Sequence, residues 1–298
     1  MNSYSLAKHK ERAVKGAFVF CAAFSIIALL TITAFLFISG APFIVKTGVF
    51  KFLFGTNWDT VSDNPSYGIF PMILSSLYVT ALSVLIGVTI GLFTAIALYK
   101  FLPKKAVPVI RQTVNLLAGI PSVIFGLFGL KIIVPFLRDY ISPTGVGYGI
   151  FASSLVLGIM ILPTIVSICL DSLESVPKEY YEGALALGAT NEQATFKVML
   201  PAAKSGVLAG VVLAVGRAIG ETMAVIMVIG GSTDIPTSLF QSVRTLTANI
   251  AMGAMDLTGD SFTALIATGV VLFVFTLLLN VSFSLLKREK KEKTEKKK

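Results

Sequence analysis

Two oppositely charged side chains stand in the middle of a long apolar run and are the residues of this sequence best suited to do chemistry. Arg217 and Glu221 lie four residues apart within 204–231, a stretch long enough to cross a bilayer. A charge at the membrane centre costs roughly 2.5–3.5 kcal/mol, so both side chains should face protein or water. The guanidinium can give charge-assisted hydrogen bonds to an oxyanion, and the carboxylate can hold the guanidinium in place and keep binding reversible. The alternative is a structural ion pair that braces a helix bundle.

Helical geometry predicts which face carries this pair. If 204–231 is one helix that turns by about 100° per residue, Arg217 and Glu221 lie on the same face as Gly206 and Gly210. The opposite face is mostly aliphatic. Because glycines let two helices approach closely, we expect the pair to face the bundle interior or an interface with a second subunit.

The remaining reactive residue types predict neither a disulfide framework nor a metal site. Cys21 and Cys169 lie in apolar runs without CxxC spacing, and His9 is the single histidine. Lys131 also falls in an apolar run, but near enough to its end for the ammonium to reach the interface. We therefore expect no catalytic residue, no metal site and no cofactor.

The segment 171–203 has helix starts and stops that a simple linker lacks. Pro177 suits the first turn of a helix, and Gly188 suits a helix end. Thr190-Asn-Glu-Gln has the spacing of a capping box, so a second short helix should begin there and end at Pro201. Acidic residues outnumber basic ones in this segment. It is either a docking surface for a soluble partner or an ordinary surface loop.

The elements that position these residues are predicted to be membrane-spanning helices. Of the 298 residues, 55% are hydrophobic and only 14% are charged, which is far below the charge of soluble domains. The backbone of a segment in lipid must satisfy its own hydrogen bonds, so the apolar runs should be helical. We expect an all-α polytopic fold with about six spans, near 16–39, 69–99, 114–137, 148–170, 204–231 and 262–286.

The distribution of basic residues predicts the orientation. Lysine and arginine concentrate in every second segment between the apolar runs, counting both ends of the chain. The loops in between contain only four basic residues: Lys46, Lys51, Arg138 and Arg244. Both termini should therefore be cytoplasmic, in a plasma (inner) membrane protein. The first apolar run is too long for a signal peptide and should be a retained helix. We divide the chain into an N-terminal segment 1–15, a membrane domain 16–286 and a basic tail 287–298, which we expect to be disordered and either lipid-binding or without a specific role.

The loop between the fourth and fifth predicted spans resembles the EAA motif of ABC-importer permeases. The resemblance rests on Glu182, Gly183, Ala184, Gly188, Leu200 and Pro201. The chain departs from the motif at Gly183, where alanine is usual, and at Val198, where isoleucine is usual. In that family the loop inserts into a cytoplasmic ATPase and transmits its motion. The sequence has no GxxxxGK[ST] motif, so ATP would have to be bound and hydrolysed by another chain.

Further stretches resemble the phosphate-specific (Pst) branch of these permeases, and most of all its C-type subunit. They begin at Asn57, Tyr67, Ala118, Ile161 and Gly216, and the last reads GRAIGETMAV. The resemblance implies a type I permease fold, a second homologous permease of the A type, two cytoplasmic ATPase subunits and an external phosphate-binding protein. It also implies that Arg217 and Glu221 lie in a phosphate path used by alternating access.

Three other functions remain open on the sequence. A permease for sulfate, molybdate or phosphonate would keep the coupling loop. An ion-coupled secondary transporter or channel would explain Arg217 and Glu221 but not that loop. A membrane sensor without transport activity is the third. The residues alone predict a multi-span protein with buried charges and a docking loop, and they do not name phosphate.

Overall fold

The computed structural model describes residues 2–103 and 105–295, with side chains for Glu11, 14–103 and 105–282. Helices dominate this part of the chain, which confirms the predicted all-α class. A small antiparallel sheet pairs β1 (Trp58–Asp59) with β2 (Ser66–Tyr67).

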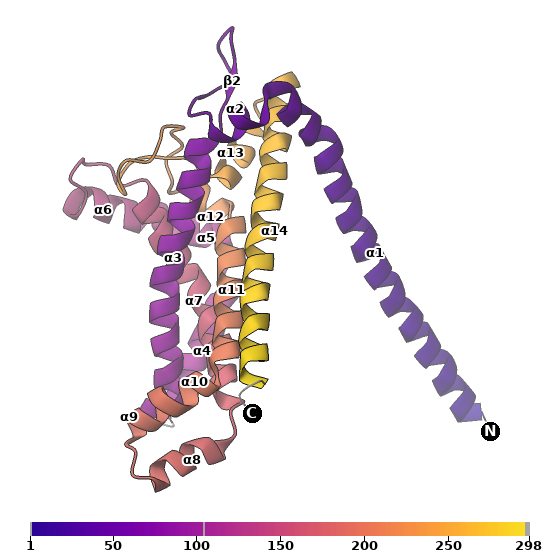
Figure 1. Cartoon of the computed structure of the whole chain (residues 1–298), viewed down its shortest axis with the longest axis vertical. Coiled ribbons are helices and arrows are strands. Elements are labelled where there is room, and N and C mark those ends of the chain that lie inside the picture. Colours follow the sequence, from indigo (N-terminus) through magenta and orange to yellow (C-terminus); the bar gives the residue numbers. More distant parts are fainter. Residues whose placement is uncertain (1, 104, 296–298) are drawn as a thin grey trace.

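Three long helices form the centre of the molecule: α3 (Phe70–Ile96), α7 (Ile150–Glu174) and α11 (Lys204–Gly220) (Figure 1). Glycines set how closely they pack. A Cβ built on Gly87 of α3 would lie 2.6 Å from Ile161 Cγ1 of α7, so a larger residue would force the helices apart.

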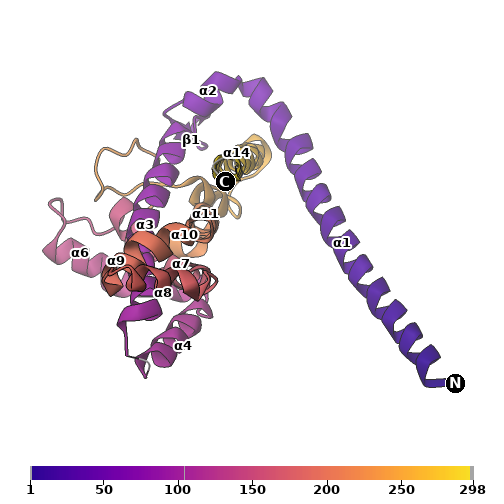
Figure 2. The same cartoon turned by 60° about the horizontal axis from the view of Figure 1, so that its bottom comes forward.

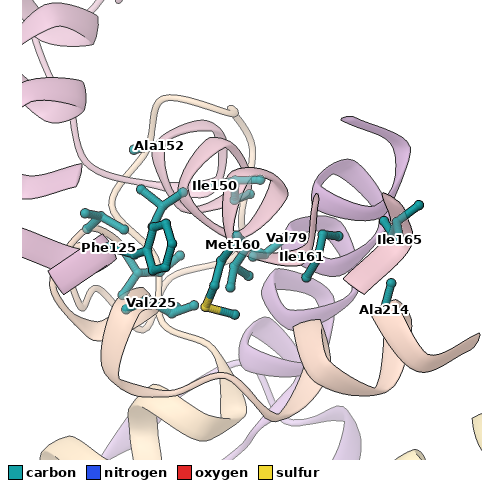
Figure 3. Packing of buried hydrophobic residues seen from close by; sticks show 14 of the residues in the cluster. Val79, Phe125, Ile150, Ala152, Met160, Ile161, Ile165, Ala214 and Val225 are labelled. Carbon is teal, nitrogen blue, oxygen red and sulfur yellow. The ribbon is translucent and has the colours of Figure 1, made fainter. Parts of the chain in front are cut away.

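Two short helices pack into the middle of this bundle. They are α5 (Ser122–Phe128) and α12 (Met223–Ile226), and they contact each other as well as α7. Figure 3 shows Phe125 of α5 and Val225 of α12 gathered around Met160 of α7. The core is therefore built partly from helices too short to cross a membrane alone.

Four helical stretches are long and apolar enough to cross a membrane alone: 14–47, 70–101, 150–174 and 259–282. The second of these comprises α3 and the π-helical turn η1 (Ala97–Phe101). The number of crossings rises to six only if each of two bent helix pairs counts as one span.

The first bent pair shows that the prediction of one continuous helix over 114–137 is wrong. Helix α4 (Ala106–Ala118) is followed by α5, which continues through η2 (Gly129–Ile133) and α6 (Val134–Tyr140), and the two parts meet at 97°. The break falls at Pro121, which has no backbone N–H and disfavours helical geometry in the residue before it. Lys131 is exposed on η2.

The end of α11 at Gly220 shows that the prediction of a single helix over 204–231 is also wrong. Helix α11 ends at Gly220, the backbone is extended at Glu221, and α12 follows as a separate short helix. At its other end, α11 meets the helical segment 191–202 at 69°. The charged pair therefore stands at the end of a helix, not in its middle.

Helix α1 (Asn2–Thr47) diverges from the bundle toward its N-terminus (Figures 1 and 2). Its later part packs on α14 (Gly259–Glu295), where Phe37 meets Phe273 edge to face at a ring-centroid distance of 5.9 Å. Its large apolar side chains between residues 14 and 32 are exposed. Helix α14 continues through the predicted end of its span at 286 to Glu295, so this part of the basic tail is helical, contrary to expectation; 296–298 lie outside the described residues.

The two ends of the bundle carry different elements (Figure 1). One end holds α8 (Lys178–Ala186) and a second helical segment made of α9 (Asn191–Gln193), η3 (Ala194–Met199) and α10 (Leu200–Ala202). The opposite end holds α2 (Val49–Phe54), the small sheet and α13 (Leu246–Gly253).

Candidate functional site

Arg217 lies in the last turn of α11, and its side chain is exposed at the edge where α11 meets α7. Its Nη1 atom donates a hydrogen bond of 3.3 Å to Thr164 Oγ1 of α7. The small-residue face of α11 packs against α7 as predicted, since a Cβ on Gly210 would lie 3.1 Å from Ile168 Cγ2. Arg217 thus remains accessible at the rim of a tightly packed helix pair.

Glu221 lies beyond the end of α11 and stabilises the start of the next helix. Its Oε1 atom accepts a hydrogen bond of 3.1 Å from the backbone N–H of Ala224 in α12. Its carbonyl oxygen accepts a hydrogen bond of 3.1 Å from Thr247 Oγ1 of α13. A carboxylate at a helix N-terminus is stabilised by the unpaired N–H groups there.

In the described part of the chain, Arg217 and Glu221 therefore do not form the predicted ion pair. Among the described residues, the salt bridges do not include Arg217 with Glu221. The prediction failed because it assumed an unbroken helix, in which residues four apart lie one above the other. Glu221 instead lines a small cavity of about 10 Å³, room for about one water molecule, together with residues that include Ser76, Thr80, Thr245 and Thr247.

The predicted helix starts and stops in 171–203 are present. Gly188 has φ +87°, and the N–H groups of Gly188 and Ala189 reach the carbonyls of Leu185 and Ala184, which is the Schellman pattern of a helix end. Thr190 and Gln193 form the capping box: the Gln193 N–H donates to Thr190 Oγ1 at 3.2 Å, and the Thr190 N–H donates to Gln193 Oε1 at 3.1 Å. The two short helices therefore meet at a defined elbow.

The six predicted coupling residues divide into an exposed group and a packed group. Glu182, Gly183, Gly188 and Pro201 are exposed, whereas Ala184 and Leu200 pack on a small core that includes Tyr181 and Met199. Next to Gly188, Leu187 is 91% exposed at the tip of the elbow. An exposed apolar tip on a firmly packed base is suited to insertion into a partner surface.

The base of the elbow is tied to the central bundle by aromatic and polar contacts. The Tyr181 hydroxyl donates to Asn191 Oδ1 at 2.8 Å, which joins α8 to α9. Lys100 Nζ, at the end of the α3–η1 span, lies 3.8 Å from the centre of the Tyr181 ring. A movement of α8 would therefore displace the residues around Lys100 in η1, at the end of the α3–η1 span.

Sequence reasoning missed Thr164 and the Lys100–Tyr181 contact as parts of these sites. Thr164 follows Pro163 within α7, and a polar residue beside a helix-interior proline was the available signal. The contact of Lys100 with Tyr181 joins residues far apart in the chain, so spacing could not have predicted it.

Comparison with known proteins adds to this geometry. The family model described as binding-protein-dependent transport system inner membrane component matches residues 87–292.

Curated relatives match over most of both chains. A probable ABC transporter permease protein, YqgH of Bacillus subtilis, is 40% identical over 262 residues, which cover 87% of this chain and 84% of the relative. The phosphate transport system permease protein PstC of Mesorhizobium japonicum is 36% identical over 277 residues, with coverage of 87% and 84%.

Solved structures share the fold at low sequence identity. A chain of the MetNI methionine ABC transporter aligns with TM-score 0.60 and 21% identity, covering 74% of this chain and 95% of that one. A chain of a bacterial alginate ABC transporter aligns with TM-score 0.63 and 17% identity, and the alignment covers 93% of this chain and 96% of that one.

Proposed function

This chain belongs to the family of binding-protein-dependent transport system inner membrane components, and we propose that it moves inorganic phosphate through the membrane as one permease subunit of an ATP-driven importer. That it is a multi-pass inner-membrane permease of the ABC-importer type follows from the family and its apolar helices. Phosphate as the substrate, the partners and the orientation are the proposed parts.

Phosphate is supported by the similarity to phosphate permeases over most of both chains, and this observation carries the proposal. The exposed Arg217 guanidinium agrees with it, because a fixed guanidinium binds oxyanions by charge-assisted hydrogen bonds. Arg217 alone would suit any oxyanion. A permease for sulfate, molybdate or phosphonate is therefore the second candidate, favoured by the less specific name of the Bacillus subtilis relative.

We place the phosphate path along the rim of the α7–α11 pair. Arg217 is accessible there, and Glu221 lines the adjacent small cavity at the α11–α12 break. The exposed position of Arg217 in a single chain is expected if the path runs between this permease and a second, homologous one. The apolar, exposed part of α1 provides further surface for lipid or for that subunit.

We assign the coupling role to the elbow of α8 and α9–α10. Its exposed residues would insert into a cytoplasmic ATPase, and the Lys100–Tyr181 contact would pass the movement to α3. Two ATPases would drive alternating access, and an external binding protein would deliver phosphate at the opposite end. The N-terminal end of α1 and the C-terminal end of α14 both lie toward the elbow end in Figure 1, which agrees with cytoplasmic termini. This chain makes and breaks no bond.

Uptake by the assembled importer tests the proposal. The permease is co-purified with its partner subunits, reconstituted into proteoliposomes and supplied with the binding protein and radiolabelled phosphate. We expect uptake only with ATP. Stronger uptake of sulfate or molybdate would favour the second candidate, and uptake without ATP or an ATPase would indicate a secondary transporter.

A further inference from the structure

A cavity at the end of the molecule opposite the elbow lies apart from Arg217 and Glu221. Its volume is about 380 Å³, room for roughly ten water molecules or a small hydrated anion. It is formed by the β1 strand with the segment after it, the loop before α13, and α13 with the turn that follows. Its lining includes Trp58, Thr60, Arg244, Asn249 and Asp256.

Arg244 is held rigidly in the wall of this cavity. Its Nε atom donates to the Gly231 carbonyl at 2.9 Å, and its Nη1 atom donates to Asn249 Oδ1 at 3.2 Å. Asn249 is completely buried, so this second contact is anchored. The Nη2 atom makes no hydrogen bond to any of the described residues.

The charge of Arg244 is partly desolvated, and no carboxylate of the described residues forms a salt bridge with it. Burial lowers the pKa of Arg244, although a guanidinium stays charged at neutral pH. Within the described residues, the salt bridges do not include Arg244. A fixed, partly buried guanidinium with free donors is an arrangement that binds anions.

A carboxylate in the same cavity adds selectivity. Asp256 is exposed and lines the cavity, where its charge repels a fully ionised anion. Phosphate keeps at least one proton near neutral pH, so a phosphate P–OH group can donate a hydrogen bond to this carboxylate. Sulfate has no such proton, so it cannot donate a hydrogen bond to Asp256 and is only repelled by the carboxylate charge.

The segment that carries Arg244 also reaches the proposed path. Thr245 and Thr247 line the small cavity around Glu221, and Thr247 donates to the Glu221 carbonyl oxygen. Within the stretch from Arg244 to Asn249, its first and last residues line the large cavity, whereas Thr245 and Thr247 line the small cavity around Glu221.

We propose that this cavity is an entry site for inorganic phosphate, in which Arg244 binds the anion and Asp256 accepts a hydrogen bond from a protonated phosphate oxygen. This inference rests on the proposed function and deepens it by adding a selective anion site ahead of Arg217. The competing explanation is that Arg244 only fastens the loop before α13.

Trp58 provides the measurement, because it is the single tryptophan of the chain and it lines the cavity. The full-length chain, reconstituted in lipid nanodiscs, is titrated with inorganic phosphate and with sodium sulfate. We expect a saturable change in tryptophan fluorescence with phosphate and binding of sulfate at least about tenfold weaker. Equilibrium dialysis with radiolabelled phosphate measures binding on the same samples independently of fluorescence.

Two variants with one matched control decide between the explanations. Arg244→Gln should weaken phosphate binding at least about tenfold, whereas Arg138→Gln, which removes the same charge from an exposed arginine paired with Asp139, should not. Asp256→Asn should reduce the ratio of the affinity for phosphate to the affinity for sulfate about tenfold. Asp256 is exposed, so this second variant remains informative if Arg244→Gln fails to fold.

Several results would overturn the inference: no phosphate binding by the wild-type chain, unchanged binding in a folded Arg244→Gln variant, or unchanged selectivity in Asp256→Asn. The assay needs neither ATP nor a partner subunit. If binding behaves as expected but the assembled importer takes up no phosphate, the proposed function is wrong and the anion site remains. If uptake is normal but these binding tests fail, only the entry site is wrong.

Discussion

At the scale of single residues, the environment of Arg217 separates an anion-binding role from a bracing role. Its observed hydrogen bond is to the neutral hydroxyl of Thr164, and its side chain is exposed. A bracing arginine would be expected to have a carboxylate within reach, which Glu221 does not provide because it lies past the end of α11. The charge of Arg217 is therefore available to a ligand.

We predict that Arg217→Gln lowers ATP-driven phosphate uptake by about 10- to 100-fold, the effect of losing charge-assisted hydrogen bonds to the anion. Assembly with the ATPase should survive, because Arg217 is remote from the elbow and makes a single hydrogen bond, of 3.3 Å, to the described residues. Uptake in proteoliposomes and co-purification of the ATPase measure the two effects separately.

The exposed Arg138, which pairs with Asp139, again supplies the matched control. Arg138→Gln should leave uptake near the wild-type rate. If Arg217→Gln instead abolished assembly or caused the chain to unfold at a lower temperature, the bracing role would be supported.

At the scale of elements, the elbow depends on one glycine. Gly188 has φ +87°, a conformation that costs other residues roughly 1–3 kcal/mol, and a β-branched side chain is among the least tolerated there. We predict that Gly188→Val changes the angle between α8 and α9–α10 and weakens association with the ATPase about tenfold. A titrated pull-down with the purified ATPase measures this affinity.

Gly183 provides the control within the same short helix. It lies in the interior of α8, and a Cβ built there would meet no atom of the other described elements within 4 Å. Gly183→Ala restores the residue that is usual in the EAA motif at this position and also favours the helix, so we expect it to preserve association with the ATPase. Equal effects of the two variants would show that the elbow's geometry is not what the ATPase recognises.

Local sequence signals predicted this elbow well but predicted the spans less well. The stop at Gly188 and the capping box at Thr190 involve neighbouring residues only, so their chemistry can be read directly from the chain. Hydropathy, in contrast, reports that a segment is apolar without reporting whether it is straight. The breaks at Pro121 and Gly220 are supported by packing between α5, α12 and α7, which involves distant residues.

The same distinction applies to the candidate site. Arg217 and Glu221 could be found because charges are rare in apolar runs. Thr164, which contacts Arg217, could not be assigned, because a hydroxyl near a proline is common in membrane helices. The cavity around Arg244 joins β1 with α13, and no sequence spacing relates those two elements.

At the scale of the whole molecule, the two ends of the bundle differ in a way that allows the proposed orientation to be tested. The elbow occupies one end, while the small sheet and α13 occupy the other (Figure 1). The proposed importer requires the elbow to face the cytoplasmic ATPase and the cavity around Arg244 to face the external binding protein. The opposite orientation would separate each surface from its partner.

Two side chains of equal exposure make this orientation measurable. Val61, beyond β1, and Leu187, at the tip of the elbow, are each 91% exposed. We predict that Val61→Cys, in a Cys21→Ser background, reacts with a membrane-impermeant maleimide in intact cells, whereas Leu187→Cys reacts only after the membrane is opened. Cys169 is buried and should contribute little background. Labelling of Leu187→Cys in intact cells would place the elbow outside, where no ATPase could reach it, and the importer mechanism would have to be abandoned.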